Sequence, residues 1–203
     1  NLTKDQGMEV HTVIVNTGGF SAEELKDIEA RAYELGSSKH VTIDITDKYY
    51  NDCVCYLIYG NILKNITYPL SVSAERMFQS IAIAQYAKDV DAEYIVHGST
   101  GAGNDQIRFD VAFAVISPQS KIITPIRDEK LSRQQEVEYL QANGVNYSWE
   151  KAKYSINRGI WGTSVGGVET LTSNQALPEE AYPTQLSRTE PSVIEIEFEK
   201  GIP

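Results

Sequence analysis

The chain has 203 residues, of which 41% are hydrophobic and 23% are charged, and its formal net charge is −10. This length accommodates one sizeable core, or one domain with part of another. The excess of acidic side chains argues against extended binding to a nucleic-acid backbone, and no apolar run approaches the ~18 residues that a membrane span needs.

Strands and helices are predicted to alternate over the first three quarters of the chain. Runs rich in β-branched residues predict strands at residues 9–16, 41–45, 92–97 and 121–125. Helical patterns cover residues 21–35, 47–63, 73–90, 104–116 and 132–144. Strands joined by helices of this length predict a Rossmann-like α/β fold, with a parallel twisted sheet and helices on both faces.

The composition changes from about residue 146. Residues 155–169 are rich in Gly and Ser, and residues 192–201 alternate between apolar and acidic side chains as an edge or hairpin strand does. We therefore predict one domain over residues 1–145 and the beginning of a second, α+β domain over residues 146–203.

The cysteines and histidines offer no metal-binding pattern. Cys53 and Cys55 are separated by one residue, which is too close for an easy disulfide between them, and the three His are scattered. Reduced thiols of this kind are typical of a cytoplasmic protein.

The most informative run is Gly-rich and follows a predicted strand. Residues 98–103 contain three Gly, and a helix is predicted to begin at Asn104. Backbone N–H groups at such a position can bind phosphate or carboxylate. Thr100, Asn104, Asp105 and Arg108 could converge on a small zwitterion, with Asp105 holding an ammonium group and Arg108 a carboxylate. The alternative is a plain strand–helix turn that Asn104 caps. The spacing matches neither G-x-G-x-x-G nor G-x-x-x-x-G-K-[ST].

Three further segments carry polar side chains that could contact a ligand. They are the turn at residues 16–19 after the first predicted strand, the segment from Tyr68 to Ser73, which continues to Glu75-Arg76, and the Gly-rich stretch that contains Ser155 and Ser164. Each of them alone is equally typical of a connection, a helix cap or a loop. The sequence shows no Ser/His/Asp or Cys/His pairing, so it gives no support for nucleophilic catalysis.

The four segments together, in this order and spacing, resemble the argininosuccinate synthase family. The most specific run is HGSTGAGNDQIRFD at residues 97–110, followed by RDEKLSRQQEVEYLQANG at 127–144 and KYSINRGIWGTS at 153–164. The resemblance implies an N-type ATP pyrophosphatase of the adenine-nucleotide α-hydrolase-like group. Such a ligase condenses L-citrulline with L-aspartate to argininosuccinate, AMP and pyrophosphate through citrullyl-AMP, in arginine biosynthesis.

The resemblance also implies sites for three substrates, with Mg²⁺ accompanying ATP and no protein nucleophile. The implied contacts are Val15 and Gly98 for ATP; Thr100, Asn104 and Asp105 for L-aspartate; and Tyr68, Ser73, Asn104, Arg108, Ser155 and Ser164 for L-citrulline. It implies that residues 1–145 are the nucleotide-binding domain and that residues 146–203 begin the synthetase and multimerisation domain. Full-length members are implied to be cytoplasmic tetramers.

Three features depart from the family pattern. The family's Ser-Gly-Gly-Leu-Asp-Thr-Ser pyrophosphate loop would precede Asn1, and members continue past Pro203. Ala102 stands where Lys is more usual, and Val15 stands where Ala is more usual. Because the first family strand is central, its loss should expose the edges of its neighbours. We therefore expect the 203-residue chain alone to be inactive or to depend on association.

Two alternative functions remain open at this stage. A non-catalytic nucleotide- or amino-acid-binding module of the same fold would not need a pyrophosphate loop. A tRNA-modifying ATP pyrophosphatase would need a basic face and usually reactive cysteines, and the net charge of −10 and the Cys53/Cys55 pair argue against it.

Overall fold

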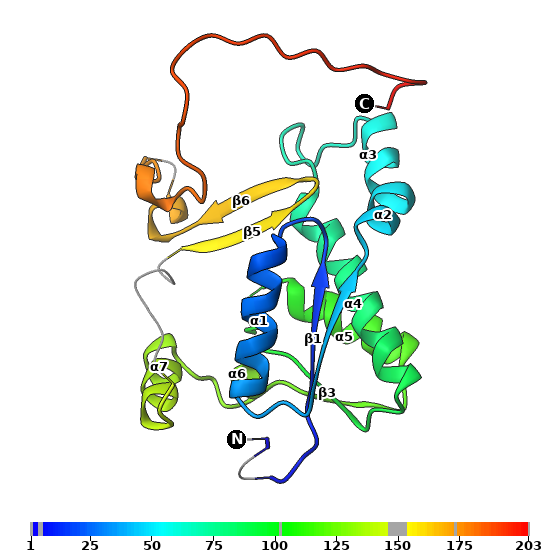
Figure 1. Cartoon of the computed structure of the whole chain (residues 1–203), viewed down its shortest axis with the longest axis vertical. Coiled ribbons are helices and arrows are strands. Elements are labelled where there is room, and N and C mark those ends of the chain that lie inside the picture. Colours follow the sequence, from blue (N-terminus) through cyan, green and yellow to red (C-terminus); the bar gives the residue numbers. More distant parts are fainter. Residues whose placement is uncertain (1, 4–5, 102, 146–153, 173, 203) are drawn as a thin grey trace.

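The computed structural model describes residues 2–3, 6–101, 103–145, 154–172 and 174–202, in which strands and helices alternate (Figure 1). The strands are β1 (His11–Asn16), β2 (Lys39–Asp44), β3 (Tyr94–Val96), β4 (Lys121–Ile123), β5 (Ser155–Gly159) and β6 (Gly162–Gly166). The helices are α1 (Ala22–Glu34), α2 (Thr46–Tyr49), the π-helix η1 (Tyr50–Val54), α3 (Cys55–Tyr59), α4 (Ser71–Asp89), α5 (Asp105–Ile116), α6 (Pro125–Asp128), α7 (Arg133–Ala142), and the short 3₁₀ helices η3 (Val168–Leu171) and η4 (Glu179–Ala181).

The strands form parallel pairs connected by helices. β1 and β2 are parallel along their whole lengths with α1 between them in the chain, and β3 and β4 are parallel with α5 between them. The predicted α/β class with parallel strands is therefore confirmed. The four parallel strands make two separate pairs, however, and within the described residues no hydrogen-bonded ladder joins β1 or β2 to β3 or β4.

Helix α1 begins where its sequence predicts, because the capping groups are local. The backbone N–H of Glu24 donates to Ser21 Oγ at 3.2 Å, and the N–H of Ser21 donates to Glu24 Oε2 at 2.8 Å. The helix ends before Gly36, which adopts a left-handed φ of +96° that suits glycine. The S-x-x-E spacing of residues 21–24 predicts such a capping box, and the structure confirms it.

Acid should weaken this cap. Hydrogen bonds from Ser21 and then from Arg158 lower the pKa of Glu24 from 4.5 to about 2. A lowered pKa means that its stabilising contribution is complete above pH 4.5 and is lost as the pH falls toward 2. We expect Glu24→Gln to lower the free energy of unfolding in urea by roughly 0.5 kcal/mol at pH 7, because the exposed site is screened. The difference from the unmodified chain should vanish near pH 2. Glu29→Gln on the same helix is the control. An equal loss of stability in that variant would contradict the role of Glu24 in the cap.

The predicted helix at residues 47–63 is interrupted and shorter. It consists of α2, η1 and α3 in succession and ends at Tyr59, followed by Gly60. Tyr49, Val54 and Cys55 are its buried residues, whereas Tyr56 and Tyr59 are exposed. The five-residue π turn changes which side chains share a face, so the 3.6-residue period does not hold through it. Helices α4, α5 and α7 lie close to their predicted ranges.

The core beneath the Gly-rich loop is built from small side chains. Ala84 and Ala87 of α4 pack with Ile95 of β3 and with Ala112 and Phe113 of α5, and all five are buried. Alanines allow two helices to approach closely, and α4 and α5 are in extensive contact. This core holds together β3 and α5, which are the two elements that the loop connects.

The C-terminal part differs from the prediction in two ways. It contains a hairpin that was not predicted, and it lacks the strand that was predicted at residues 192–201. β5 and β6 pair in antiparallel fashion within the Gly- and Ser-rich stretch. The prediction of a strand at residues 192–201 is wrong, because the segment is an extended arm with Val193 93% exposed and only a Glu199–Ile202 bridge (Figure 1). Alternating apolar and polar residues give a segment one face that could pack against a core. A strand also needs a neighbouring strand for hydrogen bonding, and among the described residues no strand pairs with this segment. Among the described helices, none is both long and apolar enough to cross a membrane.

Candidate functional site

The Gly-rich loop, residues 98–103, connects the end of β3 to the start of α5. Asn104 is at the N-cap position, but its backbone is helical (φ −85°, ψ −13°) and its side chain makes no capping hydrogen bond. The alternative of a plain turn capped by the Asn104 side chain is therefore not observed. Asn104, Thr100 and Gly98 are all exposed. The loop thus presents an amide and a hydroxyl beside the N-terminus of a 12-residue helix.

Asp105, the first residue of α5, lies between two arginines from different helices. Arg108 Nη1 donates to Asp105 Oδ1 at 2.7 Å, and Arg76 Nε of α4 donates to Oδ2 at 3.4 Å. Both arginine side chains are largely buried, at 24% and 25% exposure. An ionised carboxylate has about four acceptor positions, so Asp105 retains acceptor capacity for a ligand. The predicted proximity of Asp105 and Arg108 is confirmed by this ion pair.

Arg76 also connects this cluster to the β5–β6 hairpin. Its Nη2 donates to Asn157 Oδ1, and its Nη1 donates to Gln79 Oε1 at 2.6 Å. Asn157 is directly opposite Ser164 in the hairpin register, and Ser155 is two residues before it on the same strand. Side chains two apart on a strand, and those directly opposite across a pair, share one face. Ser155, Asn157 and Ser164 therefore share the hairpin face that meets Arg76.

Tyr68 and Ser73 lie together at the beginning of α4. The phenol oxygen of Tyr68 accepts hydrogen bonds from the backbone N–H groups of Val72, at 2.9 Å, and Ser73, at 3.3 Å. Ser73 Oγ donates to the Leu70 carbonyl at 3.1 Å. Tyr68 thus caps α4 through its oxygen and keeps its own O–H proton for a further acceptor. Trp161 Nε1 donates to the Pro69 carbonyl at 2.6 Å, so the hairpin loop also reaches this segment.

The turn after β1 lies beneath the same hairpin. Thr17 Oγ1 donates to Glu75 Oε1 of α4 at 2.7 Å, and the Thr17 carbonyl accepts from the N–H of Ile160 at 2.9 Å. Glu75 is 5% exposed, and burial raises the pKa of its carboxyl, against the lowering effect of the Thr17 hydrogen bond. The Thr17 turn, the start of α4 and the hairpin therefore form one connected structure.

The two residues implied for ATP are placed differently from the others. Val15 is 5% exposed and pairs in register with Ile43 of β2, so its side chain belongs to the core. Gly98 is exposed in the loop after β3. Among the described residues, no hydrogen bond or ion pair joins either of them to Asp105 or Arg108. Ala102, the departure from the family's usual Lys, lies outside the described residues.

Arg76 and Asn157 are functional candidates to which the sequence pattern assigned no role, although Arg76 closes the segment that begins at Tyr68. Arg76 is three residues after Ser73, and that spacing places both on one side of a helix. This was the only local signal for Arg76. Asn157 had none, because its contact with Arg76 spans 81 residues of chain.

The fold and the site together define a class of protein. Parallel strands end in turns that lead into helices, and polar and charged side chains gather at those turns, as in α/β domains that bind small anionic ligands at the carboxyl ends of their strands. The chain belongs to the argininosuccinate synthase family. Residues 1–146 match the family described as the arginosuccinate synthase N-terminal HUP domain.

Curated relatives agree with this family. The chain is 38% identical to an argininosuccinate synthase of Sulfurisphaera tokodaii over 196 residues. These residues are 96% of the chain and 50% of the relative. It is 37% identical to that of Methanocaldococcus jannaschii and 34% identical to that of Dictyoglomus turgidum, over 100% of the chain and 51% of each relative. The chain therefore spans about half the length of the relatives it matches.

Proposed function

We propose that this chain forms the amino-acid-binding part of an argininosuccinate synthase, a carbon–nitrogen ligase. In the proposed reaction the ureido oxygen of L-citrulline attacks the α-phosphorus of Mg²⁺–ATP, and pyrophosphate leaves. The amine of L-aspartate then attacks the resulting citrullyl-AMP and displaces AMP. The chain's own residues would act by holding the substrates in contact, since such juxtaposition needs no protein nucleophile.

The observation that carries the proposal is the placement of Asp105 between Arg76 and Arg108. Two guanidinium groups and one carboxylate carry a formal charge of +1 within a chain whose net charge is −10. L-Aspartate carries two carboxylates and one ammonium group, so its charges complement those of the cluster. Arg favours such sites because its planar fork binds carboxylates with two parallel hydrogen bonds.

Each substrate is assigned to one side of this cluster. Thr100, Asn104 and Asp105 would bind L-aspartate, and Gly98 and Val15 would adjoin ATP. The proposed L-citrulline contacts come from α4, α5 and the hairpin: Tyr68, Ser73, Asn104, Arg108, Ser155 and Ser164. Two observations support this assignment, namely the Tyr68–Ser73 hydrogen bond and the hairpin face that meets Arg76.

The proposal extends to organisation and compartment. Residues 1–145 would be the nucleotide-binding domain, and residues 146–203 would begin the synthetase and multimerisation domain of a homo-oligomer. The end of the family match at residue 146 supports that boundary. The free thiols of Cys53 and Cys55 support a cytoplasmic location.

Isothermal titration calorimetry of the chain with L-citrulline, L-aspartate and Mg²⁺–ATP tests the proposal. We expect L-citrulline to bind, and we expect Arg108→Gln to weaken it by about 10–100-fold, because a charge-assisted hydrogen bond to the ligand carboxylate is lost. Arg188→Gln, at an exposed arginine outside the site, is the control and should bind as the unmodified chain does.

The same titrations separate the alternatives. Binding of ATP without either amino acid would contradict the ligase assignment and favour a nucleotide-binding module. Binding of tRNA in preference to both amino acids would favour a tRNA-modifying enzyme.

A further inference from the structure

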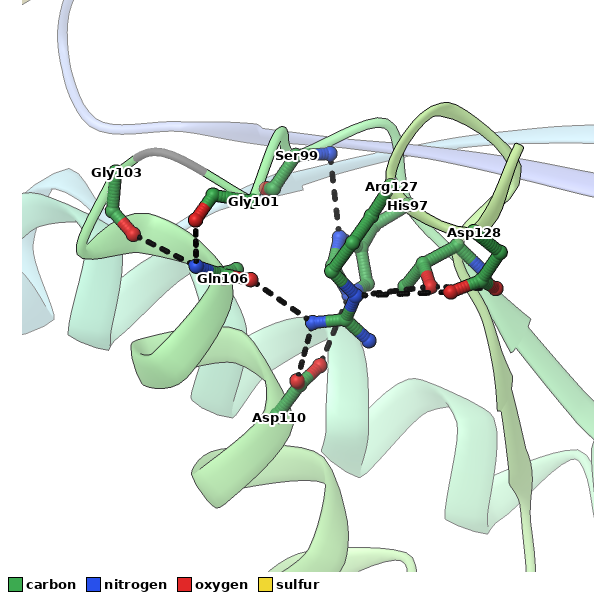
Figure 2. Close-up of polar contacts among 9 residues, drawn as sticks. His97, Ser99, Gly101, Gly103, Gln106, Asp110, Arg127 and Asp128 are labelled. Atoms are coloured by element: carbon green, nitrogen blue, oxygen red, sulfur yellow. Dashed lines mark hydrogen bonds and ion pairs between the residues drawn. The ribbon is translucent and has the colours of Figure 1, made fainter. Parts of the chain in front are cut away.

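A second, connected set of side chains holds the Gly-rich loop from behind (Figure 2). It begins with His97, whose side chain is 9% exposed and packs against the rings of Phe109 and Phe113 at centroid distances of 5.5 and 5.9 Å. The His97 Nδ1 atom accepts a hydrogen bond from the backbone N–H of Ser99 at 3.3 Å. This bond fixes the first turn of the loop to a buried ring.

Gln106 fixes the other end of the loop. Its Nε2 donates to the carbonyl of Gly101 at 2.7 Å and to the carbonyl of Gly103 at 3.1 Å (Figure 2). Both hydrogens of the amide are therefore committed to loop carbonyls. In a trans peptide the N–H points away from the C=O. The bond from Gln106 to Gly103 thus turns the backbone N–H of Asn104 away from Gln106.

Asp110 and Arg127 join the two ends. Asp110 Oδ1 accepts from His97 Nε2 at 3.1 Å, and its Oδ2 accepts from Arg127 Nη1 at 2.7 Å. The same Nη1 donates to Gln106 Oε1 at 3.2 Å. Arg127 is itself held by Thr124, whose Oγ1 accepts from its Nε at 3.1 Å.

Electrostatics favour the closed network. Burial tends to raise the pKa of Asp110, but the hydrogen bonds from Arg127 and His97, together with the charge of Arg127, outweigh it and lower that pKa. The carboxylate therefore stays ionised in the fold. Arg127 comes from α6, after β4, whereas Asp110 and Gln106 come from α5, so the network ties the loop to two separate elements.

We propose that Gln106, Asp110, Arg127 and His97 form a clamp that sets the conformation of the Gly-rich loop, with Gln106 as its central positioning residue. None of the four would need to touch a substrate. Their effect would be to orient the loop so that Thr100 and the Asn104 backbone N–H face the ligand. The proposal rests on the proposed function for the identity of that ligand, L-aspartate, but not for the conformation of the loop.

Two variants of Gln106 test the clamp. Gln106→Met removes all of its hydrogen bonds, and Gln106→Glu keeps an acceptor for Arg127 but loses the donors to Gly101 and Gly103. Hydrogen–deuterium exchange of residues 97–104 should become at least tenfold faster in both, and L-aspartate should bind at least tenfold more weakly, since two or three hydrogen bonds are lost and tenfold corresponds to about 1.4 kcal/mol. The free energy of unfolding in urea is measured alongside, and Gln134→Met on exposed α7 is the control.

The outcomes are distinct. Unchanged exchange at residues 97–104 in both variants would overturn the clamp. Faster exchange that is confined to residues 97–104, together with weaker L-aspartate binding, supports it. If the unmodified chain binds no L-aspartate, the proposed function fails, while the exchange measurement still decides whether the clamp orders the loop. If neither Gln106 variant folds, Asp110→Asn replaces them. Exchange of residues 97–104 in that variant at the rate of the unmodified chain likewise overturns the proposal.

Discussion

Asp105→Ala is expected to weaken the binding of L-aspartate by at least tenfold. The substitution removes the proposed acceptor for the ligand ammonium group, and it also removes the shared partner of Arg76 and Arg108. Loss of one charge-assisted hydrogen bond costs about 1.5–3 kcal/mol, which corresponds to roughly 10–150-fold in affinity. The two released arginines, each about one quarter exposed, would add to this loss by rearranging.

Calorimetry with three variants checks this result. Asp105→Asn preserves the shape of the side chain but not its charge, so it should lose most of the affinity if the charge is what binds. Asp52→Asn removes an exposed aspartate of η1 that pairs with Lys48 of α2, and this variant should bind L-aspartate normally. An Asp105→Asn variant that binds as tightly as the unmodified chain would contradict the assignment of Asp105 to the ammonium group.

Gly19→Ala is expected to separate the β5–β6 hairpin from the rest of the molecule. A Cβ at position 19 would be 2.2 Å from the carbonyl oxygen of Arg158 and 2.7 Å from its carbonyl carbon. These are backbone atoms, so no side-chain rotation relieves the clash. Separation would break the bond from the Ile160 N–H to the Thr17 carbonyl and the ion pair of Arg158 with Glu24. We expect a loss of about 2–4 kcal/mol in the free energy of unfolding.

Urea unfolding and hydrogen–deuterium exchange of residues 155–166 measure the effect. The matched control is Gly166→Ala in β6, where a new Cβ would meet only Thr170 Oγ1 at 3.9 Å. Exchange should accelerate in Gly19→Ala and stay unchanged in the control. L-Citrulline binding should weaken with it, since Ser155 and Ser164 belong to the displaced hairpin. A Gly19→Ala chain with unmodified stability and exchange would show that the turn and the hairpin are not in close contact.

Local chemistry is what the sequence predicted best. Ser21 with Glu24 is a capping box that needs only four residues of chain, and the structure contains it. The strand at residues 9–16 and the Gly-rich loop were likewise recognisable, because β-branched runs and glycines restrict the backbone directly. The π turn at Tyr50–Val54 was missed, since no local pattern distinguishes it from an α-helix.

Of the candidate site, the sequence identified residues but not their partners. It placed Asp105 and Arg108 three apart on one helix, which is enough to predict that they meet. It could not show that Arg76 closes the cluster from α4, or that Tyr68 caps that helix through its phenol oxygen. The contact of Arg76 with Asp105 depends on how α4 packs against α5, and that of Tyr68 depends on the conformation of the residues that lead into α4.

The sequence by itself therefore determined the alternation of strands and helices, the family, and the side chains that can bind a zwitterion, because each depends on neighbours in the chain. Only the tertiary structure decided that the parallel strands form two pairs, that the Gly- and Ser-rich stretch is a hairpin over the Thr17 turn, and that the apolar and acidic alternation at residues 192–201 forms no strand. The clamp of Arg127 on Gln106 and Asp110 also belongs to this group. Such contacts join segments that are distant in sequence, and packing and ladder geometry, rather than local pattern, determine which of them meet.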